Sequence, residues 1–199
     1  MYNLPDSTIL QKQLPKKTIY SKFEMKASQR ENFDADIARI DIVGVVSPAT
    51  IPALVVGEAV KEFYVLNVEL KRSEYDNKNI ELLSKLIPQK MILALVFEDK
   101  VKFVIHHTKL ISSVWQPVQE ATLILSGLNL DIVWENLVKK IGKISVENGR
   151  TLIEQITENE QKAKLLAKIN ALERKMTCEK QPHRKREYFE QIKNLKKKL

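Results

Sequence analysis

Short apolar runs with a two-residue period mark the first three quarters of the chain. The clearest run is Phe63–Lys71, in which Tyr64 and Leu66 share one face of an extended segment and the residues between them share the other. The β-branched run 40–46 contains Gly44, where we expect a β-bulge. The predicted strands are 40–46, 63–71, 91–97, 101–106 and 121–125, with a hairpin turn at Glu98-Asp99-Lys100 between the third and the fourth.

Apolar spacings of three and four residues predict helices between these strands. Ser28 and Glu31 have the spacing of a capping box, in which each side chain satisfies a free backbone N–H at a helix start. The predicted helices are 6–13, 28–38, 76–87 with Asp76 or Asn77 as its N-cap, and one that ends at Gly142 with Asn129 or Asp131 as its N-cap. This order of elements predicts an α+β fold, a mixed sheet flanked by helices.

After Asn148-Gly149 the pattern is helical throughout. Two runs have the alternating four-and-three spacing of a coiled-coil seam: Leu165, Ile169, Leu172 and Met176, then Tyr188, Ile192, Leu195 and Leu199. Pro182 lies between them and must kink or end the helix. We therefore predict a body at residues 1–147 and a coiled-coil-like helical hairpin at 148–199, with helices of similar length and with Leu172 and Ile192 buried between them. A continuous helix that dimerises in parallel is the competing geometry.

Positive charge is concentrated in this last segment. Residues 150–199 contain 14 Lys and Arg against 7 Asp and Glu, whereas residues 1–149 contain 19 against 18. A basic arm on a nearly neutral body favours an encounter with polyanions, and contacts with phosphates give affinity without sequence readout. The residues expected to contact DNA or RNA are Arg184, Lys185, Arg186, Lys193, Lys196, Lys197 and Lys198.

Composition excludes several other classes of protein. The longest apolar runs are far shorter than the roughly 20 residues of a membrane-spanning helix. The N-terminal residues lack the basic-then-apolar layout of a signal peptide, and Cys178 is the only cysteine, so we expect a cytoplasmic protein without disulfides. The three histidines have no zinc-site spacing, and the sequence contains no phosphate-binding or dinucleotide-binding glycine motif. We predict no metal and no cofactor.

One triplet has the form of a catalytic signature. Glu69-Leu70-Lys71 ends the clearest strand and resembles the Glu-x-Lys of PD-(D/E)xK nucleases, in which an acid and this pair hold a divalent metal. The alternation of the strand places Glu69 and Lys71 on one face. The partner acid would have to be Asp41 or Glu58, and neither follows a proline as the motif requires. An ion pair at a strand end is the competing interpretation.

Three stretches together resemble an uncharacterised bacterial family, one of the domains of unknown function. They are Leu14–Tyr20; Phe63–Lys71 with Ile87-Pro88 and Met91–Val96; and Glu179–Glu187 continuing into Ile192–Lys196. Genes of that family tend to lie beside genes for helicases and DNA methyltransferases in restriction-like and phage-defence clusters. In the family pattern Lys71 falls at a characteristic position and Glu69 does not.

The resemblance implies a setting rather than a reaction. We therefore expect a non-catalytic accessory protein of a DNA-processing or phage-defence assembly, which docks onto a helicase or methyltransferase and contacts nucleic acid through its arm. The alternatives are a divergent metal-dependent nuclease that uses Glu69 and Lys71, and a pure protein-assembly module whose charge serves solubility.

Overall fold

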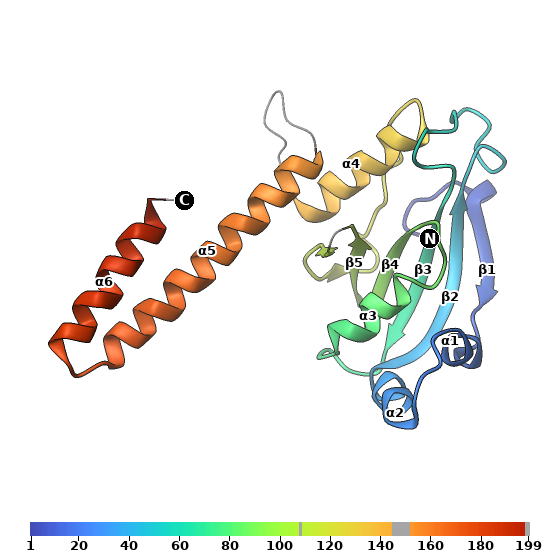
Figure 1. The fold of residues 1–199 in the computed structure, drawn as a ribbon. Coiled ribbons are helices and arrows are strands. Elements are labelled where there is room, and N and C mark those ends of the chain that lie inside the picture. The colour runs from blue at the N-terminus through green and yellow to red at the C-terminus, as the bar shows by residue number, and fades with distance from the viewer. Residues whose placement is uncertain (108, 145–151, 198–199) are drawn as a thin grey trace. The chain divides into compact units, whose positions relative to one another are not determined.

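The computed structural model describes residues 1–107, 109–144 and 152–197 (Figure 1). The chain divides into two compact units, Met1–Ile144 and Ser145–Leu199. The predicted boundary between residues 147 and 148 and the Asn148-Gly149 pair on which it rests lie outside the described residues.

The predicted α+β fold is confirmed in the first unit. Its described strands form one sheet in the order β1-β2-β3-β4-β5-β6, and the short β7 pairs with β5. The sheet is mixed because β3 and β4 are parallel, whereas every other described pair is antiparallel. The strands are β1 Ile9–Gln13, β2 Ile37–Val46, β3 Phe63–Leu70, β4 Lys90–Phe97, β5 Lys100–His106, β6 Leu110–Ser112 and β7 Gln116–Pro117.

Helices cover both faces of this sheet. The described helices of the unit are α1 Lys16–Lys22, α2 Ala27–Asp36, α3 Asn77–Leu83 and α4 Leu130–Gly142, with a 3-10 turn, η1, at Asp6–Thr8. Leu66 of β3 and Leu93 of β4 pack with Phe33 of α2 in a core on the face that carries α1, α2 and α3. On the opposite face the ring of Trp134 in α4 lies 5.4 Å from the ring of Phe63. The sheet is therefore the middle of three layers.

The parallel pair β3 and β4 requires a crossover connection, which α3 provides. The side chain of Asp76 caps α3 by accepting a hydrogen bond from the N–H of Lys78, at 2.9 Å. Since α3 runs back across the sheet, it is antiparallel to both strands and parallel to β5. It ends at Leu83, four residues before the predicted end.

Two predicted helix and strand assignments are wrong. The predicted helix 6–13 is limited to the 3-10 turn Asp6–Thr8, because Ile9–Gln13 form β1. This strand pairs with the edge of β2 although every residue of β1 is exposed. Residues 121–125 are not a strand: Ala121 and Leu123 are buried, but the backbone N–H of Leu123 donates to the carbonyl oxygen of Tyr2 at 2.9 Å instead of joining the sheet. The alternation there reflects burial alone.

The helix and strand around residue 36 also differ from prediction. α2 begins at Ala27, and the backbone N–H of Lys26 donates to the Gln29 side chain at 2.9 Å, so the expected capping box of Ser28 and Glu31 is wrong. β2 follows α2 directly, at Ile37. The bulge expected at Gly44 is present as a shift in the register of β2 against β3 between Ile42 and Gly44.

The second unit is a pair of helices, α5 Leu152–Cys178 and α6 Pro182–Lys196 (Figure 1). Pro182 is the first residue of α6, a position at which a helix loses nothing by lacking an N–H. The seam residues Ile169 and Ile192 are buried, and Lys196 Nζ donates to Glu173 Oε1 across the helices at 2.9 Å. These contacts form the predicted hairpin.

Two details of the hairpin differ from the prediction, and one predicted seam residue lies outside the described residues. The helices have 27 and 15 residues, so they are not of similar length. Leu172 is half-buried rather than buried. The last seam residue, Leu199, lies outside the described residues.

Candidate nucleic-acid interface and a polar groove in the body

The acids that the nuclease alternative would use do not converge. Asp41 and Glu69 lie on the same face of the sheet, but Arg39 is the direct cross-strand neighbour of Glu69. The guanidinium of Arg39 donates to Asp41, with Nε 2.8 Å from Oδ2. This hydrogen bond, together with the negative charges of Asp41 and Glu69, raises the pKa of Arg39. A fixed cation therefore lies beside the two acids.

Glu58 and Lys71 are also badly placed for that chemistry. Glu58 precedes β3, while Glu69 lies near its end, and the six-residue step from Phe63 to Glu69 spans about 20 Å of strand. Lys71 is exposed just after β3, and its backbone N–H donates to the carbonyl oxygen of Asp36 at 2.8 Å. Among the described residues there is no group of three or more His, Cys, Asp or Glu that could hold a metal ion.

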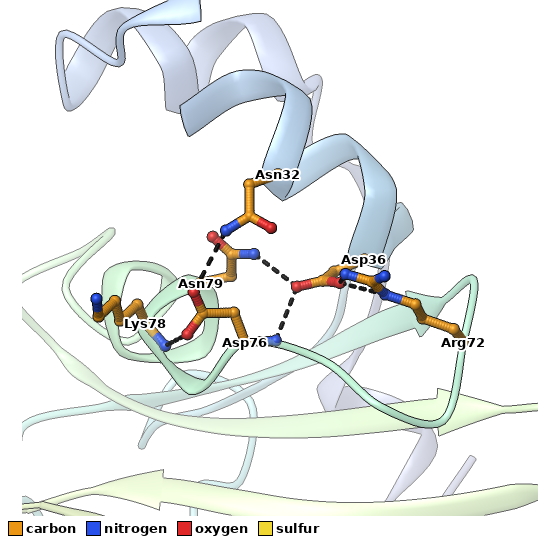
Figure 2. A network of polar contacts seen from close by, with 6 residues as sticks. All are labelled: Asn32, Asp36, Arg72, Asp76, Lys78 and Asn79. Carbon is orange, nitrogen blue, oxygen red and sulfur yellow. Dashed lines mark hydrogen bonds and ion pairs between the residues drawn. The ribbon is translucent and has the colours of Figure 1, made fainter. Parts of the chain in front are cut away.

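A buried carboxylate in the body was missed by sequence reasoning. Asp36, the last residue of α2, has a side chain with no solvent exposure. Figure 2 shows its polar neighbours. One of its oxygens accepts from Nε of Arg72 at 2.7 Å; the other accepts from the N–H of Asp76 and from Nδ2 of Asn79, both at 2.8 Å. Burial favours a higher pKa for Asp36, but these hydrogen bonds and the charge of Arg72 outweigh it and lower the pKa.

The polar contacts drawn in Figure 2 join α2, the turn 71–76 and the start of α3; we call their residues, Asn32, Asp36, Arg72, Asp76, Lys78 and Asn79, the Asp36 network. The backbone carbonyl of Asp36 accepts from the N–H of Lys71 at the start of the turn, and the carboxylate of Asp36 accepts from the N–H of Asp76 at its end. Asn32 of α2 adds a bond from Nδ2 to Asp76 Oδ2 at 3.3 Å (Figure 2). The turn and the start of α3 are thereby tied to α2. No local spacing signals this contact, since Asp36 and Arg72 are 36 residues apart.

Beside α3, the sheet carries a groove of about 440 Å³. Its floor comes from β5, where Lys102, Val104 and His106 share one face because alternate residues of a strand do. α3 forms one wall and β6 the other. The lining residues are Tyr75, Asn77, Ile80, Glu81, Lys102, Val104, His106, Lys109, Leu110 and Ser112.

Cations outnumber anions around this groove. Nζ of Lys102 lies 6.0 Å from the centroid of the Trp115 ring, at the outer limit of a cation–π contact. The one acid of the lining, Glu81, is paired with Lys85 at 2.7 Å. The hydrogen bond from Lys85, the charge of Lys85 and the charge of His106 lower the pKa of Glu81.

The predicted nucleic-acid contacts separate into two sets on α6. Lys185, Lys193 and Lys197 follow one another at spacings of eight and four residues, which places them along one ridge of the helix. Arg186 lies beside this ridge. All four side chains are exposed, and none of them makes a salt bridge within the part of the chain that the structure describes. We call these four residues the basic stripe.

The remaining predicted contacts differ from the stripe. Arg184 points toward Glu179, with NH1 3.9 Å from Oε2, and Lys196 is paired with Glu173 across the hairpin. Lys198 lies outside the described residues.

Sequence reasoning missed an aromatic residue within the stripe. Phe189 is 54% exposed and lies four residues from both Lys185 and Lys193, so its ring lies between two of the stripe's cations. A signal was present in the sequence, because Phe189 falls outside the seam spacing of Tyr188, Ile192 and Leu195.

Comparisons with known proteins give the chain a family. In the described residues no helix combines the length and the apolar character needed to cross a membrane. No curated protein and no solved structure matches the chain. The model of one family, described as Domain of unknown function (DUF4391), matches residues 2–199. The chain therefore belongs to the DUF4391 family.

Proposed function

We propose that this protein is a non-catalytic accessory subunit that binds single-stranded DNA or RNA through the basic stripe of α6 and Phe189. The observation that carries the proposal is the exposed Phe189 with Lys185, Arg186 and Lys193 three or four residues away, none of which makes a salt bridge in the described structure. Lysine and arginine side chains that are not held in salt bridges are available for phosphate contacts, and their binding displaces counterions from the nucleic acid.

The exposed ring favours single strands over duplexes. In a duplex the bases are stacked on one another, whereas an unpaired base offers its π-face to an aromatic side chain. A positively charged surface that follows the backbone, combined with an aromatic platform, is the general arrangement of proteins that bind single strands without sequence preference. Phe189 is an exposed aromatic side chain among the lysines of the basic stripe, and it can serve as such a platform.

The family resemblance supplies the setting of the proposal. Genes of the family that the sequence resembles tend to lie beside those for helicases and DNA methyltransferases. This tendency favours a protein that docks onto one of these enzymes in a cytoplasmic restriction-like or phage-defence assembly. A helicase produces single strands, so an accessory subunit with a sequence-independent contact for unpaired bases would hold the product near the motor. This partner follows from the setting and not from a docking surface.

The test compares full-length variants for binding to fluorescent oligonucleotides. The wild type should bind a single-stranded oligonucleotide of mixed sequence, DNA or RNA, with an affinity that falls steeply with salt. Changing the four stripe residues to glutamine should reduce the salt slope by about 3, since each phosphate contact with a single strand contributes about 0.7. Phe189→Ala should weaken single-strand binding about tenfold and duplex binding less than twofold.

Two controls make the result specific. A matched variant replaces four exposed lysines of the body, Lys12, Lys17, Lys78 and Lys100, with glutamine, which changes the net charge equally. It should bind like the wild type. Phe189→Trp should keep the affinity and report stacking through quenched fluorescence. Absence of binding by the wild type would contradict the proposal and leave the pure assembly module.

A further inference from the structure

The wall of the groove that α3 forms is tied to α2 by polar contacts. Tyr75 and Asn77 line the groove, and the residue between them, Asp76, is bonded to both Asp36 and Asn32. Figure 2 shows these contacts converging on the start of α3 from α2 and from the turn. The carboxylate of Asp36 at the centre of these contacts is fully buried, and a buried polar group whose hydrogen bonds are satisfied makes the surrounding structure rigid. The groove therefore has a preorganised wall, which lowers the entropic cost of binding a ligand.

Different kinds of side chain line the two ends and the middle of the groove. Because α3 and β5 run in the same direction, Tyr75 and Asn77 lie toward Lys102, whereas Glu81 lies toward His106. The charge of His106 contributes to the lowered pKa of Glu81. Ser112 is the cross-strand neighbour of Val104. Apolar side chains occupy the middle, namely Ile80, Val104 and Leu110. An apolar middle with a few convergent polar groups is typical of small-molecule sites, and 440 Å³ is within their usual range.

The chemistry of these groups selects a particular ligand. Lys102 lies over the Trp115 ring, and Ser112 on the neighbouring strand adds a hydroxyl, so this side of the groove suits an anionic oxygen group such as phosphate. The apolar middle suits a ring, and Tyr75 supplies an aromatic side chain at the edge. Glu81 and His106 offer an acceptor and a donor to polar edges of that ring.

We propose that this groove is a mononucleotide-binding site, with the phosphate at Lys102 and Ser112 and the base over the apolar middle beside Tyr75. The site uses none of the residues of the basic stripe. It is therefore independent of the proposed contact between α6 and nucleic acid, and either proposal can fail without the other.

The experiment is a titration of the full-length protein with ATP, AMP, adenosine and inorganic phosphate, by calorimetry and ligand-observed NMR. The nucleotides should bind saturably below about 1 mM, and adenosine at least tenfold more weakly, because it lacks the charged group. Lys102→Gln should weaken AMP binding about tenfold. Ser112→Asp, at an exposed position that tolerates substitution, should abolish it by placing a negative charge beside the phosphate.

Controls separate the groove from other lysines. Lys12→Gln removes the same charge from β1, at the opposite edge of the sheet, and should leave the affinity for AMP unchanged. Tyr75→Phe should retain binding, whereas Tyr75→Ala should weaken it, since the ring rather than the hydroxyl provides the contact.

Four results would overturn the proposal. They are the absence of saturable binding of ATP and AMP up to 1 mM, unchanged affinity in both Lys102→Gln and Ser112→Asp, inorganic phosphate binding as tightly as AMP, and loss of AMP binding on substitution of the basic stripe. The third result would indicate a plain anion site, and the fourth would place the nucleotide on α6. Equal urea midpoints of wild type and variants exclude unfolding as the cause of any loss.

Discussion

Replacing Asp36 with asparagine removes a charge from the interior of the first unit while preserving shape. The side chain of Asp36 is fully buried, and its two oxygens accept hydrogen bonds from Arg72, Asp76 and Asn79. An asparagine has one oxygen and one NH2 group. It keeps most bonds when its oxygen faces Asp76 and Asn79 and its NH2 group faces Arg72, whose half-exposed guanidinium can bind water instead.

The magnitude follows from these contacts. Loss of the charge-assisted bond to Arg72 should cost about 1 kcal/mol, at the low end for such bonds because Arg72 is half-exposed. The two bonds that remain change from charged to neutral acceptors and should each weaken by about 0.5 kcal/mol. Asp36→Asn should therefore lower the free energy of unfolding by about 2 kcal/mol. Asp36→Ala should lower it by about 3 to 4 kcal/mol, because the buried amide of Asn79 and the part-buried N–H of Asp76 then lose their acceptor.

Tryptophan fluorescence during urea unfolding measures this effect in the first unit alone. The chain has two tryptophans, Trp115 and Trp134, and both belong to Met1–Ile144. The free energies of wild type and variant are compared at equal m-values, so that a changed midpoint reports stability. The same variant should also weaken AMP binding in the groove, because the wall that carries Tyr75 loses its anchor.

Glu74, in the same turn, offers a matched control for Asp36→Asn. Glu74→Gln neutralises an exposed acid in the same turn and should change the free energy of unfolding by less than about 0.5 kcal/mol. If Asp36→Asn and Asp36→Ala both unfold like the wild type, the Asp36 network does not stabilise the body and the argument from its buried bonds is wrong.

Two further predictions concern acid stability and the hairpin. The folded state lowers the pKa of Asp36, so the stabilisation that the Asp36 carboxylate provides is complete above about pH 4 and is lost as the pH falls through the lowered pKa. The wild type should therefore lose stability more steeply than Asp36→Asn below about pH 4, as measured by urea midpoints. Ile192→Asp should unfold the hairpin, seen as lost ellipticity at 222 nm, without changing the tryptophan transition, because Ile192 is buried in the second unit. Phe189→Asp, the same change at an exposed neighbour, should leave the ellipticity intact, and equal losses in both variants would argue against the hairpin seam.

Elements whose cause is local could be predicted from the sequence. The strand Phe63–Leu70, the β4–β5 hairpin and the break at Pro182 follow from the side-chain period, a turn and a missing N–H. The α+β class and the family resemblance followed from the same segments. The concentration of charge in residues 150–199 was visible as a count, and it indicated the region in which the basic stripe lies.

Pairing between distant segments was decided by the tertiary structure. β1 has no buried side chain, so nothing in its own pattern distinguishes it from a helix; it is a strand because β2 offers an edge with free backbone groups. Conversely, 121–125 alternates like a strand and is not one, because the N-terminal segment takes its hydrogen bond.

The candidate sites depended most on the tertiary structure. The Glu-x-Lys triplet has the right residue spacing, but β3 ends before Lys71, and the neighbouring strand places Arg39 opposite Glu69. Asp36 reads as an ordinary acid at the end of a helix until the turn that carries Arg72 closes over it. The sequence determines the period and the charge of each segment, because these are properties of adjacent residues. Contacts between residues tens of positions apart arise only when the sheet has set its strand order, since that order decides which side chains meet.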